Sequence, residues 1–243
     1  MRIDLFLVEN GYFESREKAK NAISDMRVVV NGSTVLKSSV CVDEGSDIVI
    51  KDSLTSEYVG RGGLKLEAAL DTFNINLENL RAIDVGASTG GFTDCLLRRG
   101  VDKVYAVDIG HGQLHISLLK NPKVINLEGI NARNLTCDIV ENQLVDILVS
   151  DLSFISQKLV IPSFKNVLKN GGIAIILIKP QFEAGREHLN KNGIVKSEKV
   201  HSKVVQDVIA FAENEGYSLI GTIKSPILGG SGNTEYLAAF IRK

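Results

Sequence analysis

The chain has 243 residues, of which 44% are hydrophobic and 23% are charged, and its formal net charge is -1. This is the composition of a globular protein, with room for one large domain or for a medium domain and a small one. No apolar stretch reaches the ~20 residues that a membrane-spanning helix needs, and the amino-terminal segment is too charged for a signal peptide. Three cysteines without CxxC spacing favour reduced thiols in a cytoplasmic protein. The near-neutral charge gives no support by itself for a nucleic-acid partner.

The first part of the chain predicts a small module of helices and strands. Apolar positions in RIDLFLVEN predict a short helix, and Ser15 is placed to cap a second helix over residues 16–26. The dipeptide Asn31–Gly32 stands between two apolar stretches, which is typical of a tight β-hairpin, and residues 47–50 predict another strand. Residues 51–57 are polar and typical of a linker, so we expect a domain boundary there.

The rest of the chain alternates predicted strands and helices. The predicted strands cover residues 81–88, 103–110, 123–130, 144–155, 173–180, 218–230 and 235–243. The predicted helices between them cover residues 91–100, 162–172 and 198–216. Such alternation indicates crossover connections and a doubly wound, mostly parallel α/β sheet. Only a short turn separates the last two strands, which predicts an antiparallel pair at one end of the sheet.

A glycine-rich turn, DVGASTGG at residues 84–91, follows the first of these strands. Backbone N–H groups at the start of the next helix could bind a ligand, although the glycines also fit a tight structural turn. The spacing is not the G-x-G-x-x-G of dinucleotide sites, which disfavours a dehydrogenase. Asp108 ends the next strand, where an acid can bind ribose hydroxyls, so turn and acid together favour a nucleoside site. Asn131 follows the third strand and could contact an adenine edge or cap a turn.

Charged residues are expected to meet at the carboxyl edge of this sheet. Asp151 and Lys179 end strands, and Glu235 begins the last strand, whose antiparallel direction brings its start to the same edge. Lys65 lies in a helix before the first strand. A lysine that is partly buried beside another cation loses its proton more readily, and it could then take a proton from an alcohol near neutral pH. The alternative for each residue taken alone is a surface ion pair.

The order of these four residues around DVGASTGGFTDCLL resembles the K-D-K-E tetrad of FtsJ-like ribose 2'-O-methyltransferases. Residues 2–35 resemble the RNA-binding domain named after ribosomal small-subunit protein S-four. Joined by VGRGGLKL, the two parts resemble the TlyA (hemolysin A) family over essentially the whole chain. The resemblance implies a Rossmann-like methyltransferase fold behind a small α+β RNA-binding domain. Its sheet would have seven strands, mostly parallel, with the last strand antiparallel.

The resemblance also implies a function. Residues 1–57 would form the RNA-binding domain and linker, and residues 58–243 the methyltransferase domain. The enzyme would use S-adenosylmethionine to methylate a ribose 2'-hydroxyl of ribosomal RNA, free or in ribosomal subunits, in the cytoplasm and with neither a metal nor a membrane. An RNA-binding protein with a catalytically silent methyltransferase fold, or a haemolysin-type activity, is the alternative. The sequence does not indicate the oligomeric state.

The resemblance assigns roles to individual residues. Lys179 would be the base that Asp151 orients, while Lys65 and Glu235 would set the charge balance and hold the hydroxyl. The expected cofactor contacts are Asp84, Gly86, Ala87, Ser88, Thr89, Gly90, Gly91, Phe92, Asp108, Ile109, Asn131 and Asp151. The expected RNA contacts are Arg2, Ser15, Arg16, Lys20, Arg27 and Arg61.

Overall fold

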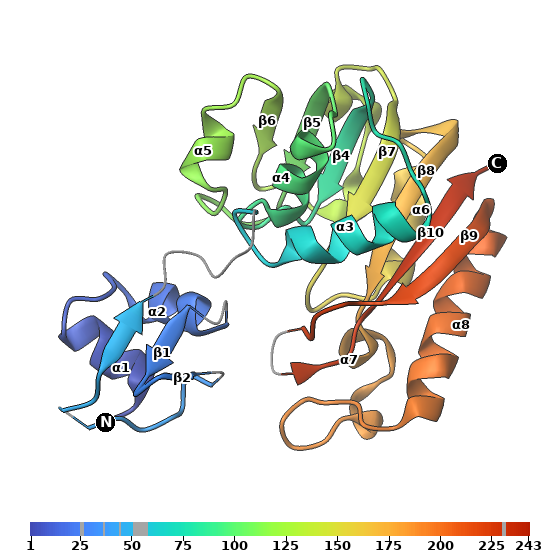
Figure 1. The fold of residues 1–243 in the computed structure, drawn as a ribbon. Helices are drawn as coiled ribbons and strands as arrows, with labels where there is room; N and C mark the ends of the chain where they lie inside the picture. Colours follow the sequence, from blue (N-terminus) through green and yellow to red (C-terminus); the bar gives the residue numbers. More distant parts are fainter. Residues whose placement is uncertain (25–26, 36, 44, 51–57, 230–231) are drawn as a thin grey trace. The chain divides into compact units, whose positions relative to one another are not determined.

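The computed structural model describes residues 1–24, 27–35, 37–43, 45–50, 58–229 and 232–243. The chain forms two compact units, Met1–Glu57 and Tyr58–Lys243 (Figure 1). The predicted linker, residues 51–57, and the end of the predicted second helix lie outside the described residues. Each unit has its own buried apolar cluster and is described by itself.

The amino-terminal unit packs two helices on a small antiparallel sheet. Its elements are α1 (Ile3–Glu9), α2 (Arg16–Ser24), β1 (Val28–Val30), β2 (Ser33–Thr34) and β3 (Ile48–Ile50), with strand order β2-β1-β3. The predicted hairpin is present, and Asn31 and Gly32 have φ angles of 48° and 78°. Positive φ at both central residues is what a type I' turn requires. Ser15 caps α2 as predicted, because its hydroxyl accepts a hydrogen bond from the backbone of Lys18 at 3.2 Å.

A buried acid, Asp4, joins the beginnings of the two helices. Its Oδ1 lies 3.0 Å from Nε of Arg2, and its Oδ2 lies 2.9 Å from Nη2 of Arg16. Burial alone would raise the pKa of Asp4, but hydrogen bonds and charge from the two guanidinium groups outweigh it and lower the pKa to about 2. Two of the predicted RNA contacts therefore also hold the fold of this unit together.

The second unit is built on a seven-stranded sheet with strand order β6-β5-β4-β7-β8-β10-β9. Its strands are β4 (Arg81–Val85), β5 (Lys103–Val107), β6 (Val124–Leu127), β7 (Val145–Ser150), β8 (Leu168–Ile178), β9 (Tyr217–Lys224) and β10 (Tyr236–Arg242). The pairs from β6 to β8 are parallel, whereas β10 runs antiparallel to both β8 and β9. The predicted fold class is confirmed, including the reversed last strand.

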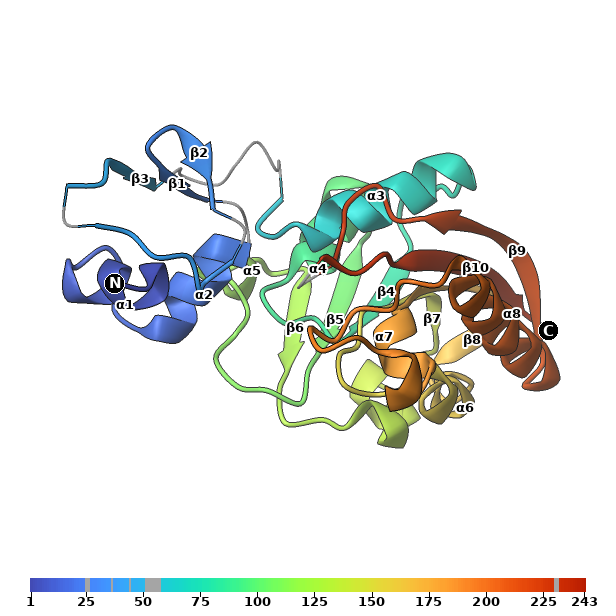
Figure 2. The ribbon, with the colours of Figure 1, turned by 90° about the horizontal axis from the view of Figure 1, so that it is seen from below.

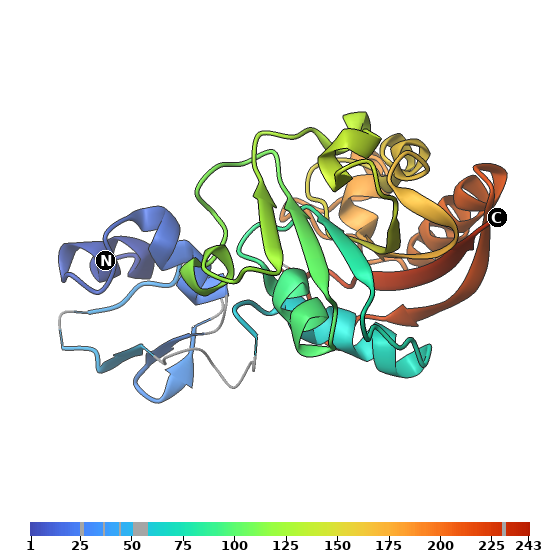
Figure 3. The same ribbon diagram turned by 90° about the horizontal axis from the view of Figure 1, so that it is seen from above.

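Helices cover both faces of this sheet. They are α3 (Gly62–Thr72), α4 (Gly91–Arg98), α5 (Ile116–Leu119), α6 (Ile161–Phe164), α7 (Pro180–Glu183) and α8 (Glu198–Asn214), with 3-10 turns η1 (Ala132–Asn134), η2 (Cys137–Val140), η3 (Gln157–Leu159) and η4 (Arg186–His188). Figures 2 and 3 show α3 and α4 on one side of the strands and α6 and α8 on the other. Leu66 and Cys95 are fully buried on the first face, and Phe164 and Val208 on the second. Burial on both faces explains the unbroken apolar runs of the central strands.

The predicted helix over residues 162–172 was wrong. The structure has only the short α6, and β8 already begins at Leu168, which pairs with Val145 of β7. The register shifts before the next pair, Ile147 with Ile173, so the residues between form a bulge. Gly171, at φ 76°, turns the chain inside this bulge. In the sequence, Gly171 and Gly172 indicate the end of the predicted helix, because glycine is common just after a helix.

We expect Asp4→Asn to destabilise the amino-terminal unit by roughly 2 kcal/mol at neutral pH. Folding lowers the pKa of Asp4 from 3.8 to about 2, and each unit of pKa shift corresponds to about 1.4 kcal/mol of folding free energy. A lowered carboxyl pKa stabilises the fold above the unfolded value, so this contribution is lost as the pH falls from about 4 to about 2. Hydrogen exchange of the α1 and α2 amides in the full chain at pH 7 measures the effect. Glu9→Gln, an exposed acid on α1, is the control, and equal exchange in both variants would contradict the prediction.

Candidate functional site

The sheet geometry brings the four predicted catalytic residues together at one edge. Strands β7 and β8 are parallel and end at Ser150 and Ile178, so Asp151 and Lys179 follow neighbouring strand ends. Strand β10 is antiparallel to β8 and pairs Tyr236 with Ile178, which places Glu235 next to Lys179. Lys65 reaches the same edge from α3.

The four side chains form two ion pairs. Nζ of Lys179 lies 2.6 Å from Oδ1 of Asp151, and Nζ of Lys65 lies 2.7 Å from Oε2 of Glu235. Both lysines are 8% exposed and Glu235 is 2% exposed. Water and salt screen such buried charges poorly, so each charge acts strongly on its neighbours. The arrangement differs from scattered surface ion pairs because both pairs share one buried edge.

Three further polar and aromatic residues, not expected from the sequence, complete this edge. The Lys179 ammonium also donates to Oγ of Ser153 at 2.9 Å, and Gln181 donates from Nε2 to Oε1 of Glu235 at 3.4 Å. Pro180 begins α7, and this first turn directs Gln181 back toward the site. Phe154 is 91% exposed at a φ of 64°. A large apolar residue directly after the polar strand end was the available signal for Phe154.

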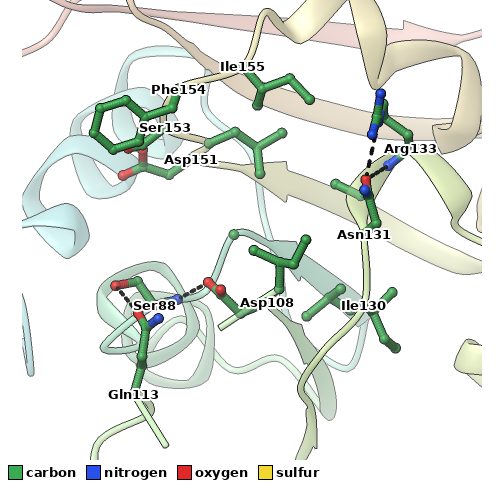
Figure 4. A pocket seen from close by; sticks show the side chains of 15 residues that line it. Ser88, Asp108, Gln113, Ile130, Asn131, Arg133, Asp151, Ser153, Phe154 and Ile155 are labelled. Atoms are coloured by element: carbon green, nitrogen blue, oxygen red, sulfur yellow. Dashed lines mark hydrogen bonds between the residues drawn. The ribbon is translucent and has the colours of Figure 1, made fainter. Parts of the chain in front are cut away.

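A pocket of about 430 Å³ opens beside these ion pairs. Figure 4 shows Asp151, Ser153, Phe154 and Ile155 on one side of it and Ser88 with Asp108 on another. Of the twelve predicted cofactor contacts, those that line the pocket are Gly86, Ser88, Asp108, Ile109, Asn131 and Asp151. Asp151 belongs both to the pocket lining and to one ion pair, so one end of a ligand in the pocket would lie beside the charged edge.

The glycine-rich turn is held closely against the end of β7. Gly86 has φ 90°, and a Cβ there would lie 2.6 Å from the carbonyl oxygen of Asp151. Only glycine fits this backbone conformation and this approach. The carboxylate of Asp108 accepts hydrogen bonds from the backbone of Ser88 at 2.8 Å and of Gly110 at 2.7 Å. Asp108 therefore orders the turn, and it also faces the pocket.

The remaining predicted cofactor contacts lie away from the pocket lining. They are Asp84, Ala87, Thr89, Gly90, Gly91 and Phe92. Phe92 is 3% exposed and packs in the apolar cluster under α3, because the first turn of α4 directs it there. A Cβ at Gly91 would lie 3.1 Å from the carbonyl oxygen of Gly60, so this glycine serves the contact between α4 and the chain entering α3.

Asp84 is fully buried beneath the turn. Its Oδ2 accepts a hydrogen bond from the hydroxyl of Thr93 at 2.7 Å, whereas its Oδ1 has no hydrogen-bond partner among the described residues. Burial raises the pKa of Asp84 to about 7, with the charges of Asp151 and Asp108 adding to the rise and Thr93 opposing it. Three carboxyl groups therefore lie around the turn, and Asp84 forms no ion pair with the residues that the structure describes.

Asn131 has the capping role that the sequence suggested, and it also lies at the pocket. Its Oδ1 accepts a hydrogen bond from the backbone of Arg133 at 3.0 Å and so caps η1. The side chains of Asn131 and Arg133 also line the pocket (Figure 4). Asn131 is therefore a capping residue at the pocket wall.

The predicted RNA contacts are spread over both units. Arg2 and Arg16 share Asp4, Lys20 is exposed on α2, and Arg27 directly precedes β1. Arg61, in the second unit, is the residue before α3. Within the described residues, no helix has the length and apolarity needed to cross a membrane. The same residues contain no group of three His, Cys, Asp or Glu side chains that could hold a metal ion.

The strand order, the single reversed strand and the pocket at the carboxyl edge define a Rossmann-like methyltransferase. The description "FtsJ-like methyltransferase" matches residues 58–242, and "S4 domain" matches residues 1–48. The chain belongs to the FtsJ-like methyltransferase family and carries an S4 domain in front of the methyltransferase domain.

Individual relatives agree with this assignment. The chain is 42% identical over 236 residues to the provisionally named rRNA methyltransferase YqxC of Bacillus subtilis, covering 97% of this chain and 84% of that protein. It is 37% identical over 235 residues to the 16S/23S rRNA (cytidine-2'-O)-methyltransferase TlyA of Mycobacterium tuberculosis, covering 97% and 87%. A solved structure from Streptococcus thermophilus, provisionally named a hemolysin, has a TM-score of 0.79 and 42% identity, covering 100% of this chain and 88% of that one. The resemblance to the TlyA (hemolysin A) family is confirmed.

We expect stability to fall as the pH rises from about 4 to about 7, because a folded-state pKa of about 7 for Asp84, raised from 3.8, penalises its ionised form. The penalty is on the order of 4 kcal/mol at most. Asp84→Asn should remove this loss, so its thermal midpoint should fall less than that of the wild type between pH 5 and pH 8. Asp102→Asn, an exposed aspartate, is the control. Identical pH dependence in the wild type and Asp84→Asn would show that the prediction is wrong.

Proposed function

We propose that this protein transfers the methyl group of S-adenosylmethionine to a ribose 2'-hydroxyl of ribosomal RNA. The observation that carries the proposal is the presence of two ion pairs, Lys65–Glu235 and Asp151–Lys179, beside a pocket that Asp108 and Asp151 line. The S4 domain and the activity named for TlyA support an RNA acceptor. A ribosomal RNA acceptor places the reaction in the cytoplasm.

The residues present fit this cofactor. S-adenosylmethionine carries a positive sulfonium and a positive amino group, and the carboxylates of Asp108 and Asp151 line the pocket. Asp108 would bind the ribose hydroxyls, Asn131 would lie at the adenine, and Gly86 leaves room for the backbone to approach the ligand. When bound, the sulfonium supplies an activated methyl group.

The protein's own part of the reaction is positioning and proton removal. Lys179 acts in its neutral form, after releasing its own proton to solvent: its amine takes the proton from the 2'-hydroxyl, and Asp151 at 2.6 Å and Ser153 at 2.9 Å stabilise the ammonium that forms again. Lys65, fixed by Glu235, holds the hydroxyl oxygen and stabilises the negative charge that develops on it. The buried strand β8 fixes where Lys179 lies, and Pro180 turns the chain away.

Each of the two units would supply RNA contacts. The exposed ring of Phe154 at the pocket mouth offers a face on which a base can stack. In the amino-terminal unit, Arg2 and Arg16 are half-exposed and ordered by Asp4, and Lys20 lies one turn after Arg16 on α2. These groups would bind phosphates.

We expect Lys179→Met to lower methyl transfer roughly a thousandfold, since general base catalysis contributes about that much, while cofactor binding persists. Methyl-tritiated S-adenosylmethionine with unmodified ribosomal subunits and naked RNA measures transfer, and calorimetry measures cofactor binding. Lys169→Met is the matched control, because Lys169 also forms a 2.6 Å ion pair with an aspartate, Asp146, which is the second residue of β7 and lies at the opposite end of that strand from Asp151.

Label in RNA that protects the ribose from alkaline cleavage, present with Lys169→Met and absent with Lys179→Met, supports the proposal. Equal transfer by the two variants would remove Lys179 from the mechanism. No label from the wild type on subunits or naked RNA would leave an RNA-binding protein with a silent methyltransferase fold.

We expect Arg16→Ala to weaken RNA binding and to reduce the slope of log affinity against log salt by about one, because one phosphate contact is lost. Arg2 still pairs with Asp4 in this variant, so the unit stays folded. Filter binding to a ribosomal RNA fragment over a salt series gives both numbers. Lys18→Ala, which removes an exposed lysine of α2 that pairs with Glu14, is the control. A larger loss from Lys18→Ala than from Arg16→Ala would contradict this placement of RNA.

A further inference from the structure

Contacts at successive positions join the loops that follow β7 and β8. Nearest the strand ends, Lys179 binds Asp151 and Ser153. Next, the rings of Phe154 and Phe182 pack with their centroids 5.0 Å apart. Beyond them, Glu183 at the end of α7 reaches back to the start of η3. The contacts of Lys179 belong to the catalytic edge, but the contacts of Glu183 have no role in the site described so far.

Glu183 accepts two hydrogen bonds from the β7 loop. Its Oε1 accepts from the backbone N–H of Gln157 at 2.7 Å, and its Oε2 accepts from the hydroxyl of Ser156 at 2.5 Å. Burial raises the pKa of Glu183, and these two donors oppose the rise. Gln157 in turn donates from Nε2 to the carbonyl oxygen of Leu177 in β8 at 3.1 Å. Glu183 thus binds the loop at a point that is itself anchored to the sheet.

The loop that Glu183 holds forms one wall of the pocket. Residues 152–155, directly before Ser156, all line it (Figure 4). Within this wall Phe154 has φ 64°, a left-handed conformation that is unfavourable for a bulky side chain such as phenylalanine. Its ring is 91% exposed, so its own burial does not offset that cost. Strained backbone of this kind persists only where surrounding contacts determine it, and the two hydrogen bonds to Glu183 are the nearest polar ones on the carboxyl side of Phe154.

We propose that Glu183 is a positioning residue for methyl transfer, whose carboxylate fixes the wall at residues 152–155 and thereby the ring of Phe154 at the pocket mouth. It touches neither the pocket nor the ion pairs and acts through the loop. The activity part of this inference rests on the proposed function, whereas the positioning of the loop does not.

The first test is Glu183→Gln, which keeps the shape of the side chain. Its amide presents one acceptor oxygen to two donors and turns an N–H group toward the other donor. We expect the value of kcat/KM for RNA to fall roughly tenfold, because one buried hydrogen bond is lost and a donor is left unpaired. Glu187→Gln, an exposed acid four residues further along with 73% of its side chain exposed, is the control and should leave it unchanged.

A double-mutant cycle separates positioning from a general structural role. In a Phe154→Ala background, Glu183→Gln should cost little more, because the group that it positions is already gone. If the fold-loss of kcat/KM in the double variant equals the product of the losses in the two single variants, Glu183 acts on activity independently of Phe154, and the proposal is overturned.

A fluorescence measurement tests the loop without any activity. The chain contains no tryptophan, so Phe154→Trp introduces a single reporter in the wall. Adding Glu183→Gln should lower the steady-state anisotropy of this tryptophan and increase its quenching by acrylamide, and unchanged values would overturn the proposal. If Glu183→Gln prevents folding, Ser156→Ala removes one of the two hydrogen bonds and should shift both readings in the same direction. A wild type that methylates no RNA refutes the proposed function, while this measurement still decides the role of Glu183.

Discussion

The reversed direction of β10 determines whether the charged edge can exist. A parallel last strand would bring its carboxyl end to this edge and would place Glu235 at the opposite end of the sheet. Because β10 runs antiparallel to β8, with Tyr236 opposite Ile178, an acid at the start of one strand meets a lysine at the end of its neighbour. The Lys65–Glu235 pair and, through Gln181, its link to the loop after β8 follow from that register.

The acids around the glycine-rich turn lower the stability of the protein alone and favour the binding of a positively charged ligand. Asp84 has an unfavourable position in the protein alone, because its buried carboxyl group lies near Asp108 and Asp151 and one of its oxygens lacks a partner among the described residues. A ligand that carries positive charge would relieve this repulsion. Proteins commonly keep such locally unfavourable groups at functional sites.

Sequence patterns predicted the features that depend on local chemistry, and missed those that depend on packing between distant segments. The Asn31–Gly32 turn and the strand ends at Asp151 and Lys179 follow from backbone preferences and apolar runs. The start of β8 at Leu168 depends on pairing with Val145, which the sequence alone does not reveal. Glu183 and Gln181 lie within four residues of the strand end at Lys179, but their partners are 26 and 54 residues away.

The shared carboxylate of Asp4 has an entropic consequence for the surface of the amino-terminal unit. Free arginine side chains lose considerable rotamer freedom when they bind an anion. Arg2 and Arg16 have already lost part of that freedom to a buried acceptor, and the three groups together carry one net positive charge rather than two. An anion that docks beside them would therefore be selected by the fixed geometry of the donors more than by charge density, which suits a chain whose overall charge is close to zero.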